Sequence, residues 1–259
     1  MTSSSNLLGR PIWYELMTTD TAAAEKFYKT VVGWTAAPFD ASPAPYTVFK
    51  RRGDVGVGGM RKRPDDMPFP PFWAMYIGVP SFDEAAAHIK RLGGRELSPV
   101  IDIPGVGRMQ MMADPQGAGF YIMQPASSGD RPEGQPELGE GSWLELMTTD
   151  AKAAMTFYQA VFGWQPSEAM DMGELGTYQM FNRPHGMIGG MMNKPKELAH
   201  VPPNWGIYFL VPDINAAVEK ITANGGQILN GPMEVPGGDW VVNAMDPQGA
   251  AFSLHARKP

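Results

Sequence analysis

Alternating apolar and polar positions near the start of the chain predict a β-strand. In WYELMTTD, residues 13–20, side chains two positions apart point the same way, so Trp13, Glu15 and Met17 share one face. A 3.6-residue apolar period follows in TAAAEKFYKTVVGW, and Asp20 stands where a helix N-cap belongs. The pattern therefore predicts a strand at 11–18 and a helix at about 20–32.

Short strands and turns rich in glycine and proline follow. Further elements are predicted as strands at 34–40, 46–53 and 54–62, a proline-rich crossover at 63–71, a strand at 72–80, a helix at 81–93, and strands at 94–105, 107–117 and 118–125. The order is a strand, a helix and three strands, and then the same order again.

The whole pattern returns about 130 residues later. WLELMTTD at 143–150 repeats the first strand, Phe157-Tyr158 repeats Phe27-Tyr28, and the turn DPQG at 114–117 returns at 246–249. Residues 126–141 are rich in Gly, Pro, Ser and Glu without any apolar period, which is typical of a linker. We therefore predict a module at 1–125, a linker at 126–141 and a second module at 142–259.

Composition narrows the function. The 259 residues carry a net charge of −6 and no basic stripe, which argues against binding to nucleic acid. The chain has no cysteine, so disulfides, a thiol nucleophile and cysteine-ligated metals are excluded. No apolar run is long enough to cross a membrane and no leader pattern is found, so we expect a cytoplasmic protein. Because both modules lie in one chain, we expect a monomer or a homodimer.

These features resemble the glyoxalase/bleomycin-resistance/ring-cleaving dioxygenase superfamily, whose members are also called vicinal oxygen chelate proteins. The resemblance rests on the junction at Asp20 with Phe27-Tyr28 and Gly33-Trp34, the strand YIGVP at 76–80, and the DPQG turn before GFYI. It covers nearly the whole chain, twice, and is strongest to two-module glyoxalase-like proteins, some of which are called hydroxylases. It implies an α+β fold in which paired βαβββ units form a U-shaped mixed sheet around a cavity.

At the positions where metal-dependent members of this family carry their ligands, the chain departs from the pattern. The first ligand position holds Trp13 and Trp143, the second Ala74 and Gly206, and the third Tyr121 and Ser253. None of these side chains is a usual ligand of a divalent metal. We therefore predict a metal-free site and no cofactor.

The inward strand positions supply the predicted ligand-binding residues, which are mainly aromatic side chains and methionines. They are Trp13, Met17, Met60, Tyr76, Met111 and Tyr121 in module one, and Trp143, Met147, Met191, Tyr208, Ser253 and His255 in module two. Such a lining fits an apolar or aromatic small molecule. Glu15 and Glu145 lie among them as candidate catalytic residues; the alternative is a structural carboxylate paired with an arginine or with backbone donors.

Among the histidines, His255 alone falls at an inward strand position, where it could form an acid–base pair with Glu145. His88 on a helix, His200 in a proline-flanked loop and His185 in a turn are expected at the surface. The chain shows no phosphate-binding glycine loop and no Ser-His-Asp order.

Three functions stay open on this basis. The first is metal-independent binding of a small aromatic or hydrophobic molecule. The second is a glyoxalase-like enzyme, of lyase, isomerase or hydroxylase type, that uses Glu15 or Glu145 as acid and base. The third is a structural or interaction protein whose pockets are filled by side chains.

Overall fold

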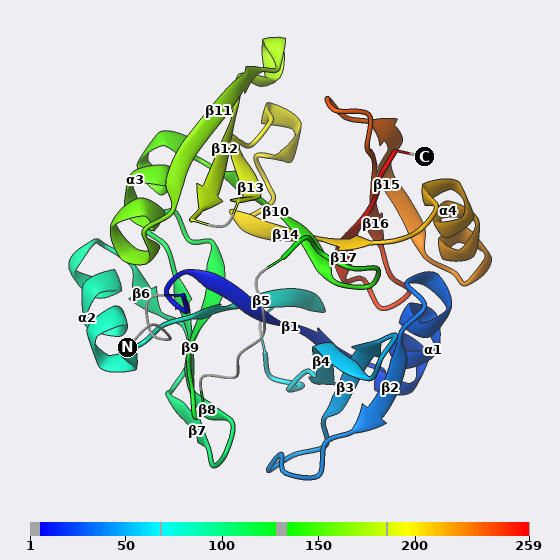
Figure 1. Cartoon of the computed structure of the whole chain (residues 1–259), viewed down its shortest axis with the longest axis horizontal. Coiled ribbons are helices and arrows are strands. Elements are labelled where there is room, and N and C mark those ends of the chain that lie inside the picture. Colours follow the sequence, from blue (N-terminus) through cyan, green and yellow to red (C-terminus); the bar gives the residue numbers. More distant parts are fainter. Residues whose placement is uncertain (1–5, 68, 128–133, 185, 259) are drawn as a thin grey trace. The chain divides into compact units, whose positions relative to one another are not determined.

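The computed structural model describes residues 6–67, 69–127, 134–184 and 186–258 and confirms the predicted α+β fold of two tandem modules (Figure 1). Module one contains β1 (Arg10–Thr18), α1 (Thr21–Val31), β2 (Thr35–Pro38), β3 (Thr47–Arg51), β4 (Val55–Lys62), β5 (Phe72–Gly78), α2 (Phe82–Arg91), β6 (Arg95–Glu96), β7 (Ile101–Ile103), β8 (Gly107–Ala113) and β9 (Gly119–Pro125). Module two contains β10 (Gly141–Thr148), α3 (Ala151–Phe162), β11 (Gln165–Asp171), β12 (Thr177–Arg183), β13 (Gly186–Asn193), β14 (Asn204–Leu210), α4 (Ile214–Ala223), β15 (Gln227–Glu234), β16 (Trp240–Met245) and β17 (Ala251–Ala256). No helix in these described ranges is long and apolar enough to cross a membrane.

The sequence repeat is not the unit of packing. The first compact unit contains Met1–Ile12, Met75–Gly134 and Leu144–Trp205, and the second contains Trp13–Ala74, Gln135–Trp143 and Gly206–Pro259. Each compact unit therefore combines half of module one with half of module two.

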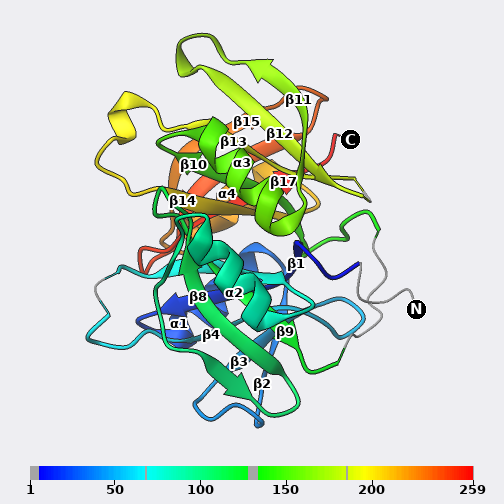
Figure 2. The same ribbon diagram turned by 90° about the vertical axis from the view of Figure 1, so that its left-hand side faces the viewer.

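Both units are built from the same parts. The second unit holds the strand path β2-β3-β4-β1 from module one and β14-β17-β16-β15 from module two, and its helices α1 and α4 lie side by side (Figure 1). The first unit holds β5-β9-β8-β6 and β11-β12-β13-β10, with α2 beside α3 and packed on β9 (Figure 2). Each strand path contains one parallel pair, β1–β4, β10–β13, β5–β9 or β14–β17, and the pairs that follow in the path are antiparallel.

Two local predictions have different outcomes. The N-caps are confirmed, because the Asp20 side chain accepts the Ala23 amide at 3.0 Å and that of Asp150 accepts the Ala153 amide at 2.9 Å. The single strand predicted at 94–105 is wrong. It is split into β6 and β7 around Ser98-Pro99, because a proline has no amide hydrogen to donate to a sheet.

In the second unit, a buried hydrogen-bond chain joins the two modules. Tyr28 Oη donates to Asp246 Oδ2 at 2.9 Å and accepts a hydrogen bond from Trp73 Nε1 at 2.9 Å. Asp246 Oδ1 accepts the amides of Gln248 and Ala250, both at 2.9 Å. Burial raises the pKa of Asp246, and these hydrogen bonds oppose that rise.

The first unit repeats this chain with the modules exchanged. Tyr158 Oη donates to Asp114 Oδ2 at 3.0 Å and accepts from Trp205 Nε1 at 2.9 Å. The Phe-Tyr and DPQG landmarks of the repeat thus act together with Trp73 and Trp205, and they attach a turn of each module to a helix and a strand of the other.

The end of the predicted linker is packed against the second unit. Gly139 accepts a hydrogen bond from Trp34 Nε1 at 2.8 Å, and its φ of +86° suits glycine. Arg51 Nε lies 2.8 Å from Glu140 Oε1. In the first unit, Trp164 Nε1 binds the Gly9 carbonyl in the same way at 2.8 Å. The start of each module is thus fixed by a tryptophan, and residues 128–133 of the linker lie outside the described ranges.

The buried hydroxyl of the first threonine in each Thr-Thr-Asp sequence is expected to destabilise the fold. Thr18 and Thr148 are fully buried, and neither Oγ1 has a hydrogen-bond partner among the described residues. Because a buried hydroxyl without a partner is destabilising and valine has the same shape, we expect Thr18→Val and Thr148→Val each to raise the free energy of unfolding by about 1 kcal/mol. Urea unfolding measures this, with the exposed Thr19→Val as control. Unchanged or lower stability in both buried variants would show that the hydroxyls are satisfied.

Candidate functional site

Glu15 lies in a polar network on the inward face of β1, in the second unit. It is 4% exposed, its Oε1 is 3.0 Å from Arg61 Nε, and Arg61 also donates to Met17 Sδ at 3.8 Å. Tyr46 Oη accepts a hydrogen bond from Trp13 Nε1 at 2.8 Å. Burial and the neighbouring Glu15 charge raise the pKa of Tyr46, which hydrogen-bonds to Glu15 and stays protonated. This arrangement favours the structural alternative for Glu15, a carboxylate paired with an arginine.

Glu145, the counterpart of Glu15, has a different setting in the first unit. Tyr178 Oη donates to Glu145 Oε2 at 3.1 Å, as the equivalent Tyr46 bonds to Glu15 in module one. The residue after the Gly-Gly-Met sequence is Arg61 in module one and Met192 in module two. The two glutamates are therefore chemically unlike, although both are held by a tyrosine.

Glycines make the tyrosine–glutamate contacts possible. A Cβ atom on Gly59 would lie closer than 3.0 Å to the Tyr46 ring, and one on Gly190 equally close to the Tyr178 ring. The ring of each tyrosine thus packs directly against a glycine of the neighbouring strand. Tyr46 and Tyr178 were not predicted as site residues; they occupy equivalent positions in the two modules, each ahead of a Gly-Gly-Met sequence, and this recurrence was the signal that could have identified them.

Met60 and Met191 do not share the glutamates' face, contrary to prediction. The parallel register pairs Leu16 with Met60 and Leu146 with Met191, so both methionines lie on the opposite face of the sheet. The residues that pair with Met17 and Met147 on the glutamate face are Arg61 and Met192. Alternation along a single strand does not set how β4 aligns with β1 or β13 with β10, and the observed register turns both methionines away from the glutamates.

The first unit brings Tyr76, Met111 and Tyr121 together. The rings of Tyr76 and Tyr121 stack with centroids 4.3 Å apart and planes 3° from parallel. Met111 pairs with Tyr121 across β8 and β9 and is 9% exposed. Tyr121, at a position where metal-dependent family members carry a ligand, is thus part of a buried cluster of aromatic and thioether side chains.

The matching face of the second unit is polar. Asn243 Nδ2 donates to Tyr208 Oη at 3.0 Å and to Ser253 Oγ at 2.8 Å. Asn243 occupies the place of Met111 in the repeat and was not predicted as a site residue; aligning the modules could have identified it. The two modules have therefore diverged in the chemistry of equivalent positions.

His255 has two partners in the second unit that the sequence did not suggest. Its Nε2 lies 2.9 Å from Asp239 Oδ2, and its Nδ1 lies 3.0 Å from Ser142 Oγ. Although no Ser-His-Asp order is found along the sequence, the fold brings Ser142, His255 and Asp239 together from distant segments. Of the other histidines, His200 is exposed, His88 is partly exposed, and His185 lies outside the described residues.

The described residues do not fit a divalent metal. Among them, no group of three or more His, Asp or Glu side chains could hold a metal ion. The family's ligand positions carry an indole, a methyl group and a phenol in module one, and an indole, a hydrogen atom and a hydroxyl in module two. No chemical step is therefore derived through a metal.

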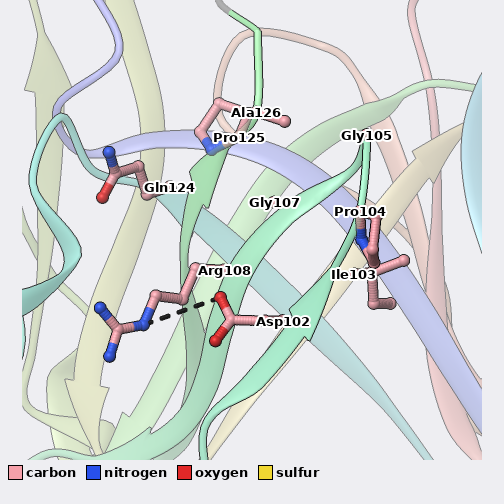
Figure 3. A pocket seen from close by; sticks show the side chains of 9 residues that line it. All are labelled: Asp102, Ile103, Pro104, Gly105, Gly107, Arg108, Gln124, Pro125 and Ala126. Atoms are coloured by element: carbon pink, nitrogen blue, oxygen red, sulfur yellow. Dashed lines mark ion pairs between the residues drawn. The ribbon is translucent and has the colours of Figure 1, made fainter.

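A shallow hollow lies on the first unit, apart from the predicted residues (Figure 3). Its volume is about 430 Å³, and its lining includes Asp102, Arg108 and Gln124. Arg108 forms ion pairs with Asp102 at 3.8 Å and with Asp83 at 3.0 Å. Gln124 Oε1 accepts the Phe82 amide at the start of α2. Arg108 and Gln124 thus already have partners within the protein, and we interpret the hollow as a structural feature of the surface.

Sequence comparisons match both modules to one superfamily. Residues 13–123 match the family described as "Glyoxalase-like domain", and residues 142–254 match "Glyoxalase/Bleomycin resistance protein/Dioxygenase superfamily". The "Putative glyoxylase CFP32" of Mycobacterium tuberculosis is 33% identical over 256 residues, which cover 95% of this chain and 94% of that protein. The "Anthracycline biosynthesis protein DnrV" of Streptomyces peucetius is 30% identical over 262 residues, which cover 95% and 92%.

Solved structures show the same fold at low identity. The Mn(II)-bound glyoxalase from Novosphingobium aromaticivorans superposes with a TM-score of 0.65 at 18% identity, covering 98% of this chain and 83% of that one. A variant of homoprotocatechuate 2,3-dioxygenase from Brevibacterium fuscum gives a TM-score of 0.67 at 18% identity, covering 97% and 72%.

Proposed function

The chain belongs to the glyoxalase/bleomycin resistance protein/dioxygenase superfamily, and we propose that it is a metal-independent member that binds a small aromatic or hydrophobic molecule. The observation that carries the proposal is the Tyr76–Tyr121 stack, with Tyr121 at a ligand position of the metal-dependent relatives. A phenol stacked on a second phenol is a poor metal ligand but a good partner for an aromatic surface.

The neighbouring side chains support the same class of ligand. Met111 lies beside Tyr121, and thioether side chains adapt to apolar ligands of varied shape and make favourable contacts with rings. One relative is named for anthracycline biosynthesis, and an anthracycline is a planar fused-ring aromatic compound. An anthracycline is therefore a suitable probe for this chain.

We expect the full chain to bind an anthracycline equally well with and without excess EDTA, and Tyr121→Leu to weaken binding at least 10-fold. The leucine keeps apolar volume but removes the ring, and a ring contact of about 1.4 kcal/mol corresponds to that factor. Quenching of tryptophan fluorescence during titration measures the affinity, and isothermal calorimetry checks the stoichiometry.

The exposed Phe69→Leu is the matched control, because it removes a ring that is 47% exposed. Its affinity should equal that of the unaltered protein. Binding that disappears in EDTA and returns with Mn²⁺ contradicts the metal-independent proposal. Equal affinity of Tyr121→Leu and the unaltered chain contradicts the role of the tyrosine stack.

An acid–base enzyme is the second candidate, favoured by the tyrosine that holds each glutamate and by the relative named a putative glyoxylase. In that case, turnover of a 2-oxoaldehyde–thiol adduct by EDTA-treated protein should be lost in Glu145→Gln while anthracycline affinity is kept. Glu15→Gln is the paired variant, and its smaller effect is expected because Arg61 already neutralises Glu15. Absence of turnover in the unaltered, EDTA-treated protein refutes this candidate and leaves the binding role.

A further inference from the structure

Ser142, His255 and Asp239 form a continuous hydrogen-bond chain in the second unit. Ser142 lies at the start of β10, His255 on β17, and Asp239 immediately before β16. The distances are 3.0 Å from Ser142 Oγ to His255 Nδ1 and 2.9 Å from His255 Nε2 to Asp239 Oδ2. The order hydroxyl, imidazole, carboxylate is that of an activated nucleophile, its base and an orienting group.

The hydrogen atoms in the Ser142–His255–Asp239 network can be placed by starting from Asp239. Burial by itself would raise the pKa of Asp239, but hydrogen bonds from the Lys258 amide and from His255 lower it below its usual value. The ionised carboxylate only accepts, so His255 Nε2 carries a hydrogen. In the neutral imidazole, Nδ1 then has a lone pair directed at the Ser142 hydroxyl.

The Ser142 hydroxyl has a second acceptor, the Tyr208 carbonyl oxygen at 3.1 Å. When His255 is protonated at both nitrogens, Nδ1 donates to Ser142 Oγ, and the hydroxyl hydrogen turns to Tyr208. The serine therefore keeps a defined position whether or not the imidazole holds the extra proton.

We propose that Ser142 is a nucleophile activated by His255 and Asp239, and that it accepts acyl groups from activated esters such as aryl esters. Ser142 Oγ bonds to the acyl carbon as the bond to the aryloxide breaks. The hydroxyl proton passes to His255 Nδ1 and then to the departing aryloxide. Water next attacks the acyl-serine and His255 takes its proton; the bond from Ser142 Oγ to the acyl carbon then breaks, His255 returns the proton to Ser142 Oγ, and the carboxylic acid leaves. Asp239 acts through His255, as a positioning residue.

Aryl esters are the expected class because an aryloxide is a stable leaving group. Their acyl transfer therefore depends least on a preformed site for the carbonyl oxyanion. The three hydrogen-bonded residues are also accessible to small reagents, since the side chains of His255 and Asp239 are 17% and 35% exposed and Ser142 is partly exposed.

This arrangement is confined to module two. The repeat places Ile12, Gly107 and Met123 at the positions of Ser142, Asp239 and His255, so none of the three functions has a counterpart in module one. The proposed activity is thus separate from the aromatic-binding surface formed by Tyr76 and Tyr121 in the first unit.

The test is labelling of the full chain with a fluorophosphonate, followed by intact mass and peptide mapping, together with the acylation burst from p-nitrophenyl acetate. We expect one adduct, on Ser142, and its loss in Ser142→Ala. His255→Gln should slow labelling at least 100-fold. Asp239→Asn should slow it about 10-fold, with partial recovery in Asp239→Glu, a pattern that a purely structural aspartate does not give.

Ser98→Ala is the matched control, because Ser98 Oγ also donates to a carbonyl oxygen, that of Pro99 at 2.9 Å, and no histidine bond to it is present in the structure described. It should label like the unaltered chain. Equal labelling of Ser142→Ala and the unaltered protein, or an even spread of adducts over several serines, overturns the proposal. Circular dichroism verifies folding, and if His255→Gln unfolds, the Ser142→Ala result decides.

Discussion

Asp246→Ala is expected to lower the free energy of unfolding by about 4 kcal/mol, because three donors lose their buried acceptor and each such loss costs about 1–3 kcal/mol. These donors are Tyr28 Oη and the amides of Gln248 and Ala250. Asp114→Ala removes the equivalent acceptor in the first unit and should have a similar effect. Urea unfolding followed by circular dichroism measures both changes.

Asp150→Ala is the control for this prediction. Asp150 also accepts a backbone amide, but it caps α3 at the surface, so its loss should cost only about 1 kcal/mol. A loss for Asp246→Ala no larger than that of Asp150→Ala would show that the Tyr28–Asp246 chain contributes little.

The contributions of Asp114 and Asp246 to the free energy of unfolding should change with pH in a definite direction. Burial raises the pKa of Asp114 and Asp246 in the folded state above the unfolded value, so the folded protein binds protons more tightly. Each carboxylate therefore opposes folding above its folded pKa, and this opposition is relieved as the pH falls toward the unfolded value near 3.9. The stability advantage of the unaltered chain over Asp246→Asn should accordingly grow as the pH is lowered from 7 toward 4.

Gly190→Ala is expected to break the Tyr178–Glu145 hydrogen bond. The added Cβ would lie closer than 3.0 Å to three atoms of Tyr178, so the ring must leave its place above β13. Overpacking of this kind costs about 1–3 kcal/mol of stability. Because the displaced tyrosine no longer orients Glu145, we also expect any turnover that depends on Glu145 to fall at least 10-fold.

Gly134→Ala provides the control, since no heavy atom lies within 4 Å of a Cβ at that position. The variant pair Tyr178→Phe and Gly190→Ala separates packing from hydrogen bonding, because Tyr178→Phe removes only the hydroxyl. Unaltered stability in Gly190→Ala would contradict the close crossing of the Tyr178 ring and the strand.

Part of the site could be predicted from alternation along single strands. The shared face of Trp13, Glu15 and Met17 required only period-two geometry, and that of Met111 and Tyr121 required in addition the turn that joins β8 to β9. Tyr76 meets Tyr121 through the parallel pairing of β5 with β9, which is set by tertiary structure. Met60 and Met191 were placed on the wrong face because the register between two parallel strands depends on the long connection between them. A shift of one residue reverses every side chain.

The contacts between the candidate residues and their partners depend on tertiary structure. Arg61 beside Glu15, Asn243 between Tyr208 and Ser253, and Asp239 beside His255 all arise from strand pairings or from a turn that returns to the sheet. In each case, the residues are separated by 10 to 46 positions in the chain. Local periodicity contains no information about such meetings.

The sequence by itself determined the duplication, the βαβββ order, the helix caps at Asp20 and Asp150, and the unusual side chains at the family's metal-ligand positions. These follow from local periodicity, from turn chemistry and from comparison of one half with the other. Only the tertiary structure decided that each compact unit combines halves of both modules, that Tyr28 and Tyr158 reach aspartates of the other module, and that Ser142, His255 and Asp239 meet. The physical reason is that burial and hydrogen-bond satisfaction act on residues that are close in space, and the folded chain alone sets which residues those are.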